Sequence, residues 1–133
     1  GVKENGGKLT ITYNRNKEKG EDLAKELGCE LIHCRDAGAQ SIDILINCSP
    51  VGMNPNINES PFLARDFKEG MVVFDSVYNP LETKLLREAK AAGCKVIPGS
   101  ELFINQAARQ FELFTGQPAP IDAMREVLME KLN

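Results

Sequence analysis

Short apolar segments alternate with amphipathic ones along almost the whole chain, and this alternation is the strongest constraint on its fold. Residues 8–13 alternate apolar and polar side chains with a period of two, which is typical of a strand. Residues 42–47 and 71–75 are almost entirely apolar, as expected for strands of a parallel sheet that is covered on both faces. Shorter strand candidates are 29–33 and 95–97.

Helical patterns fill the intervals between these strands. Residues 16–27 place Leu23, Ala24 and Leu27 on one face, as an amphipathic helix does. Pro80 suits the first turn of a later helix because proline lacks the amide proton that this turn leaves unpaired. The further helices are expected at 80–92, 100–115 and 121–132. Strands and helices that alternate at this spacing predict an α/β fold with a parallel sheet.

Composition limits the classes of function. The chain has 133 residues, of which 42% are hydrophobic and 26% charged, and its 16 basic and 19 acidic residues leave a net charge of −3. It contains no run of about 18 apolar residues, which a membrane-spanning helix needs. A nucleic-acid-binding protein should carry a basic surplus, which this chain lacks. An enzyme with separate cofactor and substrate domains is usually longer, so we expect an incomplete protein.

Cysteine usage bears on the compartment and on metals. The four cysteines form no Cys-x-x-Cys pair, and three of them adjoin strand-like segments, where a free cysteine behaves as a small hydrophobe. Two disulfides are the alternative for a small secreted chain. We favour a reduced protein of the cytoplasm, or of the plastid if the source is a plant. A structural zinc site usually needs four ligands. His33 is the only histidine, so no metal site is expected.

The carboxyl ends of the expected strands carry the residues of greatest interest, because ligands of parallel α/β sheets bind there. The four loops at these ends begin at Asn14, Asn47, Asp75 and Pro98. In the first loop, Arg15, Lys17 and Lys19 gather at a helix start, where positive charge opposes the helix dipole. An anionic ligand such as the 2′-phosphate of NADP explains them, since a guanidinium can grip phosphate oxygens. A solvated basic cluster is the alternative.

The other three loops carry weaker signals. Residues 47–53 combine small polar residues with Pro-x-Gly, which either presents backbone groups to a ligand or forms a simple turn. Tyr78 stands beside a helix start, where its hydroxyl is either a proton or hydrogen-bond donor or an ordinary surface group. Gly99 permits close approach, and Gln106 lies about two turns into the following helix. The residues of that helix interpreted as core packing are Phe103, Ala107, Phe111 and Phe114.

Together the loops resemble the cofactor-binding domain of the shikimate dehydrogenase family, from about Lys8 through Gly116. The Asn-Arg-Thr, Asn-x-x-Pro-x-Gly-Met, Asp-x-x-Tyr-Asn-Pro and Gly-x-x-Met-x-x-x-Gln-Ala segments of that family occur in order. They match Asn14, Arg15, Asn47, Pro50, Gly52, Met53, Asp75, Tyr78, Asn79, Pro80, Gly99, Gln106 and Ala107. Asn16 replaces threonine and Leu102 replaces methionine. Four segments in order at the expected spacing are highly specific.

The resemblance implies a Rossmann-like fold and reversible NADPH-dependent reduction of 3-dehydroshikimate to shikimate, a step of aromatic amino-acid biosynthesis. Some members of the family are joined to a dehydroquinate dehydratase. The partner is then a small-molecule substrate rather than nucleic acid or a membrane, and a homodimer is compatible with the resemblance. The implied cofactor-binding residues are Asn14, Arg15, Asn16 and Lys19 at the 2′-phosphate, Asn47 and Ser49 at the central stretch, and Gly99 and Leu102 at the nicotinamide. The implied substrate contacts are Tyr78 and Gln106.

Parts of the family pattern are missing. No Gly-x-Gly-x-x-Gly loop precedes Lys8, and the family's catalytic Lys and Asp belong to an N-terminal substrate domain. We therefore assign no catalytic residue, and expect residues 1–133 to be a partial NADP-binding domain, a fragment without activity of its own. In the strand order 3-2-1-4-5-6, loss of strand 1 leaves two unpaired strand edges. A quinate-using relative and a non-catalytic nucleotide-binding module remain the alternatives.

Overall fold

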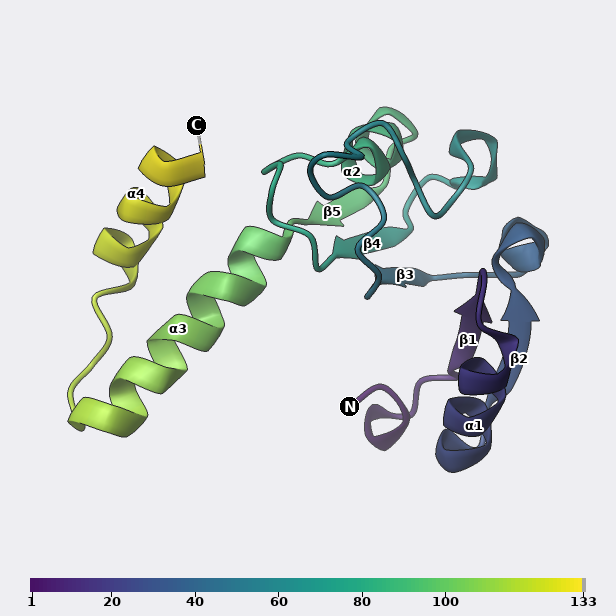
Figure 1. The fold of residues 1–133 in the computed structure, drawn as a ribbon, viewed down its shortest axis with the longest axis horizontal. Helices are drawn as coiled ribbons and strands as arrows, with labels where there is room; N and C mark the ends of the chain where they lie inside the picture. Colours follow the sequence, from purple (N-terminus) through teal and green to yellow (C-terminus); the bar gives the residue numbers. More distant parts are fainter. Residues whose placement is uncertain (133) are drawn as a thin grey trace. The chain divides into compact units, whose positions relative to one another are not determined.

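The computed structural model describes residues 1–132 and has an α/β fold, as predicted (Figure 1). The chain divides into two compact units, Gly1–Ser41 (unit 1) and Ile42–Asn133 (unit 2). The elements of unit 1 are η1 (Lys3–Asn5), β1 (Thr10–Tyr13), α1 (Lys17–Leu27), β2 (Glu30–His33) and η2 (Cys34–Ala39). Those of unit 2 are β3 (Ile44–Asn47), η3 (Ala64–Asp66), β4 (Val72–Asp75), α2 (Lys84–Ala91), β5 (Lys95–Ile97), α3 (Gly99–Thr115) and α4 (Ile121–Leu132).

In unit 1, α1 connects two parallel strands, β1 and β2. Asn16 is the N-cap of α1, and Gly28 ends the helix in the left-handed conformation with φ 58°, which glycine adopts without strain. Of the three apolar residues expected to share the buried face, only Ala24 is buried, while Leu23 and Leu27 are exposed. The predicted helix is therefore correct, but its buried stripe is narrower than its sequence indicates.

In unit 2, β3, β4 and β5 form a parallel sheet in that order, and α2 packs against β4 and β5. The helix contributes Leu85 and Leu86, which are fully buried together with Val73 of β4. Burying a leucine side chain stabilises a fold by roughly 1.5–3 kcal/mol. This contact therefore anchors the loops that lead into and out of β4.

Within residues 1–132, β1 pairs only with β2 and β3 pairs only with β4, so the strands form two separate sheets. The strand orders of the two sheets are β1-β2 and β3-β4-β5. The prediction that β3 is covered on both faces is wrong, because Ile44 and Ile46 are 59% and 43% exposed. No helix in the described part of unit 2 packs extensively on β3, and its second face therefore stays open.

The start of α2 differs from the prediction. The helix begins at Lys84 rather than at Pro80, and its N-cap is Thr83, whose Oγ1 accepts a hydrogen bond from Leu86 N at 3.3 Å. Proline at the first turn and threonine at the N-cap are both common starts. Thr83 becomes the N-cap because its hydroxyl also donates a hydrogen bond to Asp75. This contact joins α2 to the end of β4 and cannot be read from the local sequence.

The buried stripe of α3 also differs from the prediction. The helix buries Gly99, Ser100, Ile104 and Ala108, whereas Phe103 is half-exposed and Phe114 is 87% exposed. The aromatic side chains were expected in the core because they share helical spacing. Instead, Phe103 faces α4, which returns beside α3 (Figure 1) and lines a shallow apolar groove with it. The core side of α3 is thus formed by smaller residues that permit close packing.

An ion pair ties α4 to the first turn of α3. The guanidinium of Arg125 donates to both carboxylate oxygens of Glu101, with Nη2 at 3.0 Å from Oε2. This hydrogen bonding holds the pKa of Glu101 below its usual value. A carboxyl group with a lowered pKa contributes stability above its ordinary pKa and loses that contribution as the pH falls through the lowered value.

We therefore expect Arg125→Gln to lower the free energy of unfolding at pH 7 slightly, as is usual for ion pairs exposed to solvent. Urea denaturation of both proteins from neutral to acidic pH checks this. The difference between them should vanish at pH values well below the ordinary carboxyl pKa of about 4.3. Arg35→Gln removes an exposed cation that forms no ion pair within residues 1–132, and it serves as the control. If the difference in the free energy of unfolding between wild type and Arg125→Gln stayed the same at low pH, this would contradict the role of the Glu101 charge.

Candidate functional site

The carboxyl end of β1 presents exposed polar and cationic side chains. Asn14 and Arg15 follow the strand directly, and Asn16 is the N-cap of α1. The Oδ1 atom of Asn16 accepts a hydrogen bond from Lys19 N at 3.0 Å. Its Nδ2 has no partner among residues 1–132 and remains a hydrogen-bond donor. The asparagine at this position thus caps the helix while offering an amide to a ligand.

The cations around this loop differ in their pairing. Lys17 Nζ lies 3.1 Å from Glu21 Oε1, and the hydrogen bond to Glu21 and its charge raise the pKa of Lys17. Arg15 and Lys19, by contrast, form no ion pair in the part of the chain that the structure describes. Because a helix N-terminus also exposes unpaired N–H groups, Arg15 and Lys19 with the start of α1 can bind an anion.

An aromatic pair adjoins the same end of unit 1. The rings of Tyr13 and His33, which face each other at the ends of β1 and β2, meet edge-on with centroids 5.1 Å apart. His33 Nδ1 accepts from Arg35 N at 3.1 Å, which leaves Nε2 as the donor of the neutral ring. Sequence motifs did not predict this pair. The signal that would have found it is the parallel register of the two strands.

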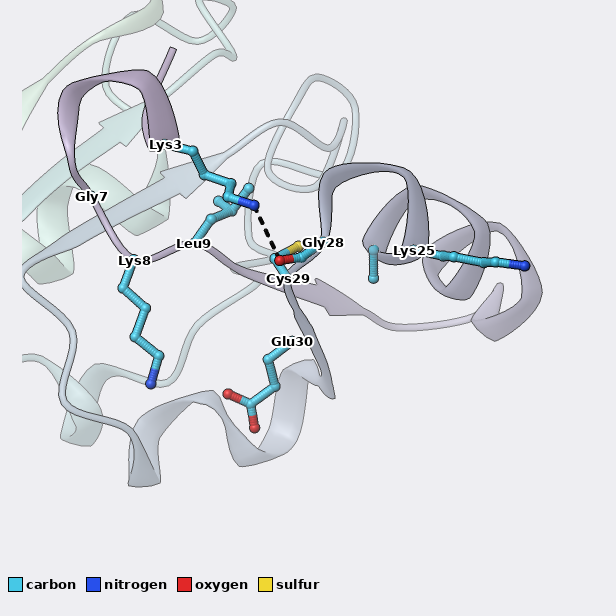
Figure 2. A pocket seen from close by; sticks show the side chains of 9 residues that line it. Lys3, Gly7, Lys8, Leu9, Lys25, Gly28, Cys29 and Glu30 are labelled. Atoms are coloured by element: carbon cyan, nitrogen blue, oxygen red, sulfur yellow. Dashed lines mark hydrogen bonds between the residues drawn. The ribbon is translucent and has the colours of Figure 1, made fainter.

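A cavity of about 450 Å³ lies at the other end of unit 1, near the amino ends of β1 and β2 (Figure 2). Lys3 Nζ donates there to Gly28 O at 3.1 Å and to Leu27 O at 2.5 Å. The ammonium thus satisfies carbonyls that the C-terminus of α1 leaves unpaired. Figure 2 shows that Lys25 extends away from Lys3 rather than toward it. The chemistry of this cavity is therefore that of a helix cap, and the candidate site lies at the carboxyl ends.

In unit 2, the predicted loop after β3 folds around the side chain of Asn47. The Oδ1 atom of this buried residue accepts from Ser49 N at 3.0 Å and from Ser49 Oγ at 2.7 Å. Its Nδ2 donates to Val51 O at 3.2 Å and to Asp75 Oδ1 at 2.9 Å. The loop after β3 and the end of β4 are thus joined by a side-chain hydrogen bond. Sequence analysis placed Asp75 in a motif but did not foresee this contact.

Gly99 brings the start of α3 directly against the loop after β4. A Cβ atom at this position would lie 2.5 Å from Val77 O and 2.6 Å from Ser76 O. Both distances are shorter than real Cβ contacts, and both partners are backbone atoms. Only glycine therefore allows this approach of α3 to the loop without a shift of the backbone.

Tyr78 lies beside the exposed side of α3. Its ring contacts that of Phe103, with centroids 5.0 Å apart and planes inclined by 37°. Leu102 and Gln106 are exposed on the same helix, one turn apart, and so share a face. The aromatic contact thus places Tyr78 next to the part of α3 that carries the other predicted residues. No motif in the sequence indicated that Phe103 would be the partner of Tyr78.

The predicted site residues form two groups, each at the carboxyl ends of the strands in its own unit. Asn14, Arg15, Asn16 and Lys19 belong to unit 1, and the others to unit 2. Across residues 1–132, no three side chains of His, Cys, Asp or Glu gather in a way that could hold a metal ion. Among the same residues, no helix combines the length and apolar character needed to cross a membrane.

Comparison with known proteins agrees with the motifs. Residues 99–129 match the family described as the shikimate 5′-dehydrogenase C-terminal domain. The NADP(+)-dependent shikimate dehydrogenase of Maridesulfovibrio salexigens is 38% identical over 133 residues, which cover 99% of this chain and 49% of that protein. The chloroplastic bifunctional 3-dehydroquinate dehydratase/shikimate dehydrogenase of Arabidopsis thaliana is 38% identical over 131 residues, or 96% of this chain and 22% of that protein.

A solved structure has the same fold. The shikimate 5-dehydrogenase of Thermus thermophilus, crystallised with NADP(H) and shikimate, matches with a TM-score of 0.83 and 33% identity. The match covers 96% of this chain and 48% of that one, so the chain spans about half the length of the single-function relatives it matches. In its motifs, its fold and its sequence, the chain is thus similar over nearly its whole length to about half of a shikimate dehydrogenase, and residues 99–129 match the family's C-terminal domain.

Proposed function

We propose that this chain is the NADP-binding half of a shikimate dehydrogenase, which reversibly reduces 3-dehydroshikimate to shikimate with NADPH. The observation that carries the proposal is the similarity, over nearly the whole chain, to an enzyme crystallised with both NADP(H) and shikimate. The preference for NADP is supported by Arg15, which is exposed and forms no ion pair within the described residues. An acidic residue at this position would instead favour NAD.

In the proposed site, Asn14, Arg15, Asn16 and Lys19 hold the adenosine 2′-phosphate. The guanidinium of Arg15 can bind two phosphate oxygens at once, and the unpaired Nδ2 of Asn16 adds a neutral donor. The exposed ammonium of Lys19 supplies a further charge beside the start of α1. This set of donors fits a dianionic phosphate better than a ribose hydroxyl, which needs an acceptor.

The proposed roles in unit 2 concern the other half of the cofactor and the substrate. The loop that contains Asn47 and Ser49 lines the central stretch of NADP, and Gly99 and Leu102 lie against the nicotinamide. Gly99 supports this assignment because its missing side chain lets the start of α3 lie directly against the loop after β4, which brings these two segments of the proposed site together. The residues that we propose to contact the substrate are Tyr78 and Gln106.

When bound, NADPH supplies the hydride that reduces the substrate carbonyl, and the protein supplies binding and orientation. The residues of this chain hold the cofactor and the substrate in position. We assign the proton transfer to the carbonyl oxygen to a substrate domain outside residues 1–133, in keeping with relatives of about twice this length. A cytoplasmic location, or a plastid one in a plant, and a homodimeric assembly are also part of this proposal.

The test compares the isolated 133-residue chain with the complete protein that contains it. We expect the complete protein to oxidise shikimate with NADP, followed by the absorbance of NADPH, and the isolated chain to show no turnover. The reason is that the proposal assigns the proton transfer to a substrate domain outside residues 1–133. A complete protein without this activity would refute the proposed function. Turnover by the isolated chain would refute the proposal that proton transfer requires a substrate domain outside residues 1–133.

A further inference from the structure

Asp75 is a fully buried carboxylate at the end of β4, in the middle of the strand-end loops of unit 2. Its exposed fraction is 0%, and it forms no ion pair within residues 1–132. An unpaired buried charge is costly, so its retention depends on hydrogen bonds. The carboxylate has three: Asn47 Nδ2 at 2.9 Å, Val77 N at 3.0 Å and Thr83 Oγ1 at 2.6 Å.

In all three contacts the carboxylate of Asp75 is the acceptor. The backbone N–H of Val77 can only donate, and so can the Nδ2 of Asn47. Thr83 Oγ1 accepts from Leu86 N and donates its own proton to Asp75 Oδ2. Three donors therefore converge on two oxygens that accept all of them, and a protonated carboxyl group would turn one acceptor into a donor.

The contact to Asn47 orients that side chain and, through it, the loop after β3. Asn47 Nδ2 donates two hydrogen bonds, to Asp75 and to Val51 O, and its Oδ1 accepts two from Ser49. These four bonds use the full capacity of a primary amide. The amide cannot turn over, because Asp75 needs a donor and Ser49 N needs an acceptor. Asn47 thus shapes the loop and has no hydrogen bond left for a ligand.

The two other contacts hold the segment after β4. Val77 N binds the same oxygen, Oδ1, that Asn47 binds, and Thr83 is both the partner of Oδ2 and the N-cap of α2. This segment contains Tyr78, and its carbonyls at positions 76 and 77 form the surface on which Gly99 rests. One carboxylate therefore holds both the loop after β3 and the segment after β4, and the latter adjoins the start of α3.

We propose that Asp75 is a positioning residue. Its carboxylate holds residues 47–53 and 76–83 in the arrangement that receives the nicotinamide half of the cofactor and the substrate, and it acts through Asn47 and Thr83 rather than by touching either ligand. The inference rests on the proposed function, because it names a determinant of the same site. According to this inference, Asn47 does not bind the cofactor with its side chain; it contributes by holding the backbone of its loop in position.

The experiment uses the complete enzyme with Asp75→Asn, Thr83→Val and Thr83→Ser. We expect Asp75→Asn and Thr83→Val to lower kcat/KM for shikimate oxidation about ten- to a hundredfold, the range for loss of a charge-assisted hydrogen bond. The loss should be equal with NADP and with NAD, since the loops receive the part that both cofactors share. Thr83→Ser keeps the hydroxyl and should restore kcat/KM to within about threefold of the wild-type value.

A purely structural role gives a different pattern. Asp75→Asn or Thr83→Val would then lower Tm while kcat/KM of the folded enzyme stayed at the wild-type value, and this result would overturn the proposal. If Asp75→Asn does not fold, the comparison of Thr83→Val with Thr83→Ser tests the proposal instead. If the hydroxyl of residue 83 positions the loops, Thr83→Ser, which keeps it, must be more active than Thr83→Val. A rescue that fails would also count against the positioning role.

Hydrogen exchange separates this inference from the proposed function. In the unliganded wild-type protein, the amides of Ser49 and Val77 should exchange slowly, and in Thr83→Val and Asp75→Asn both should exchange at least about tenfold faster. A wild-type protein without dehydrogenase activity refutes the proposed function, while this readout still tests whether Asp75 holds the two loops. Unchanged exchange at Ser49 in both variants would refute the coupling of Asp75 to the loop after β3.

Discussion

The Gly99→Ala variant is expected to be less stable than the wild-type chain by about 2–3 kcal/mol, at the upper end of the range for overpacking. The added methyl group would lie 2.5 Å from Val77 O and 2.6 Å from Ser76 O. Neither atom can rotate away, because both belong to the backbone just after β4. Either α3 or this segment must shift, and urea denaturation of the purified chain measures the cost.

Gly20→Ala is the matched control for this variant. Position 20 is also buried and helical, but the nearest atom to its added methyl group is Leu31 Cδ1 at 3.0 Å, at the end of a flexible side chain. Alanine is favoured over glycine within helices by about 1 kcal/mol, which offsets the small rearrangement. The control should therefore stay within about 1 kcal/mol of the wild type. Equal stability of Gly99→Ala and the wild type would contradict the close approach of α3.

Arg15→Ala is expected to weaken NADP binding in the complete enzyme by about ten- to a hundredfold, the value of a charge-assisted hydrogen bond to phosphate. NAD binding should change by less than about threefold, because NAD lacks the 2′-phosphate. Arg15 is exposed and forms no ion pair in the described residues, so its removal costs the fold little. Titration calorimetry with both cofactors gives the two dissociation constants directly.

Lys25→Ala is the control for net charge in this experiment. Lys25 is an exposed cation in the last turn of α1, so its removal changes the charge of unit 1 by the same amount at the other end of the helix. It should leave the ratio of the two dissociation constants at its wild-type value. Arg15→Lys keeps the charge but loses the planar fork, and should fall between the wild type and Arg15→Ala. An equal loss of both cofactors in Arg15→Ala would rule out the 2′-phosphate assignment.

Elements with local start and stop signals could be predicted well from the sequence. The helix α1 begins after Asn16 and ends before Gly28, and both residues act as caps within their own segment. The strand β5 and the helix α4 have the bounds expected from the sequence, 95–97 and 121–132. Such signals depend on residues within a few positions of each other, which a single sequence contains in full.

Features that depend on distant neighbours were predicted less well. The pattern of β3 is apolar on both sides, yet Ile44 and Ile46 are exposed because nothing in the described part of unit 2 packs over them. The buried stripe of α3 runs through Ile104 and Ala108 rather than through Phe103. Hydrophobic spacing identifies a helix face, but the elements that meet it decide whether that face becomes core.

For the site, the sequence by itself determined which residues follow the strands, and hence that Arg15, Asn47, Tyr78 and Gly99 lie at carboxyl ends. The strands can be predicted because the spacing of apolar residues and the turn residues that end each strand are local features of the sequence. Only the tertiary structure decided that Asp75 joins the loop after β3 to the start of α2. A buried carboxylate takes its partners from segments 28 and 8 residues away, and burial, which removes water as the competing partner, is a property of the folded chain alone.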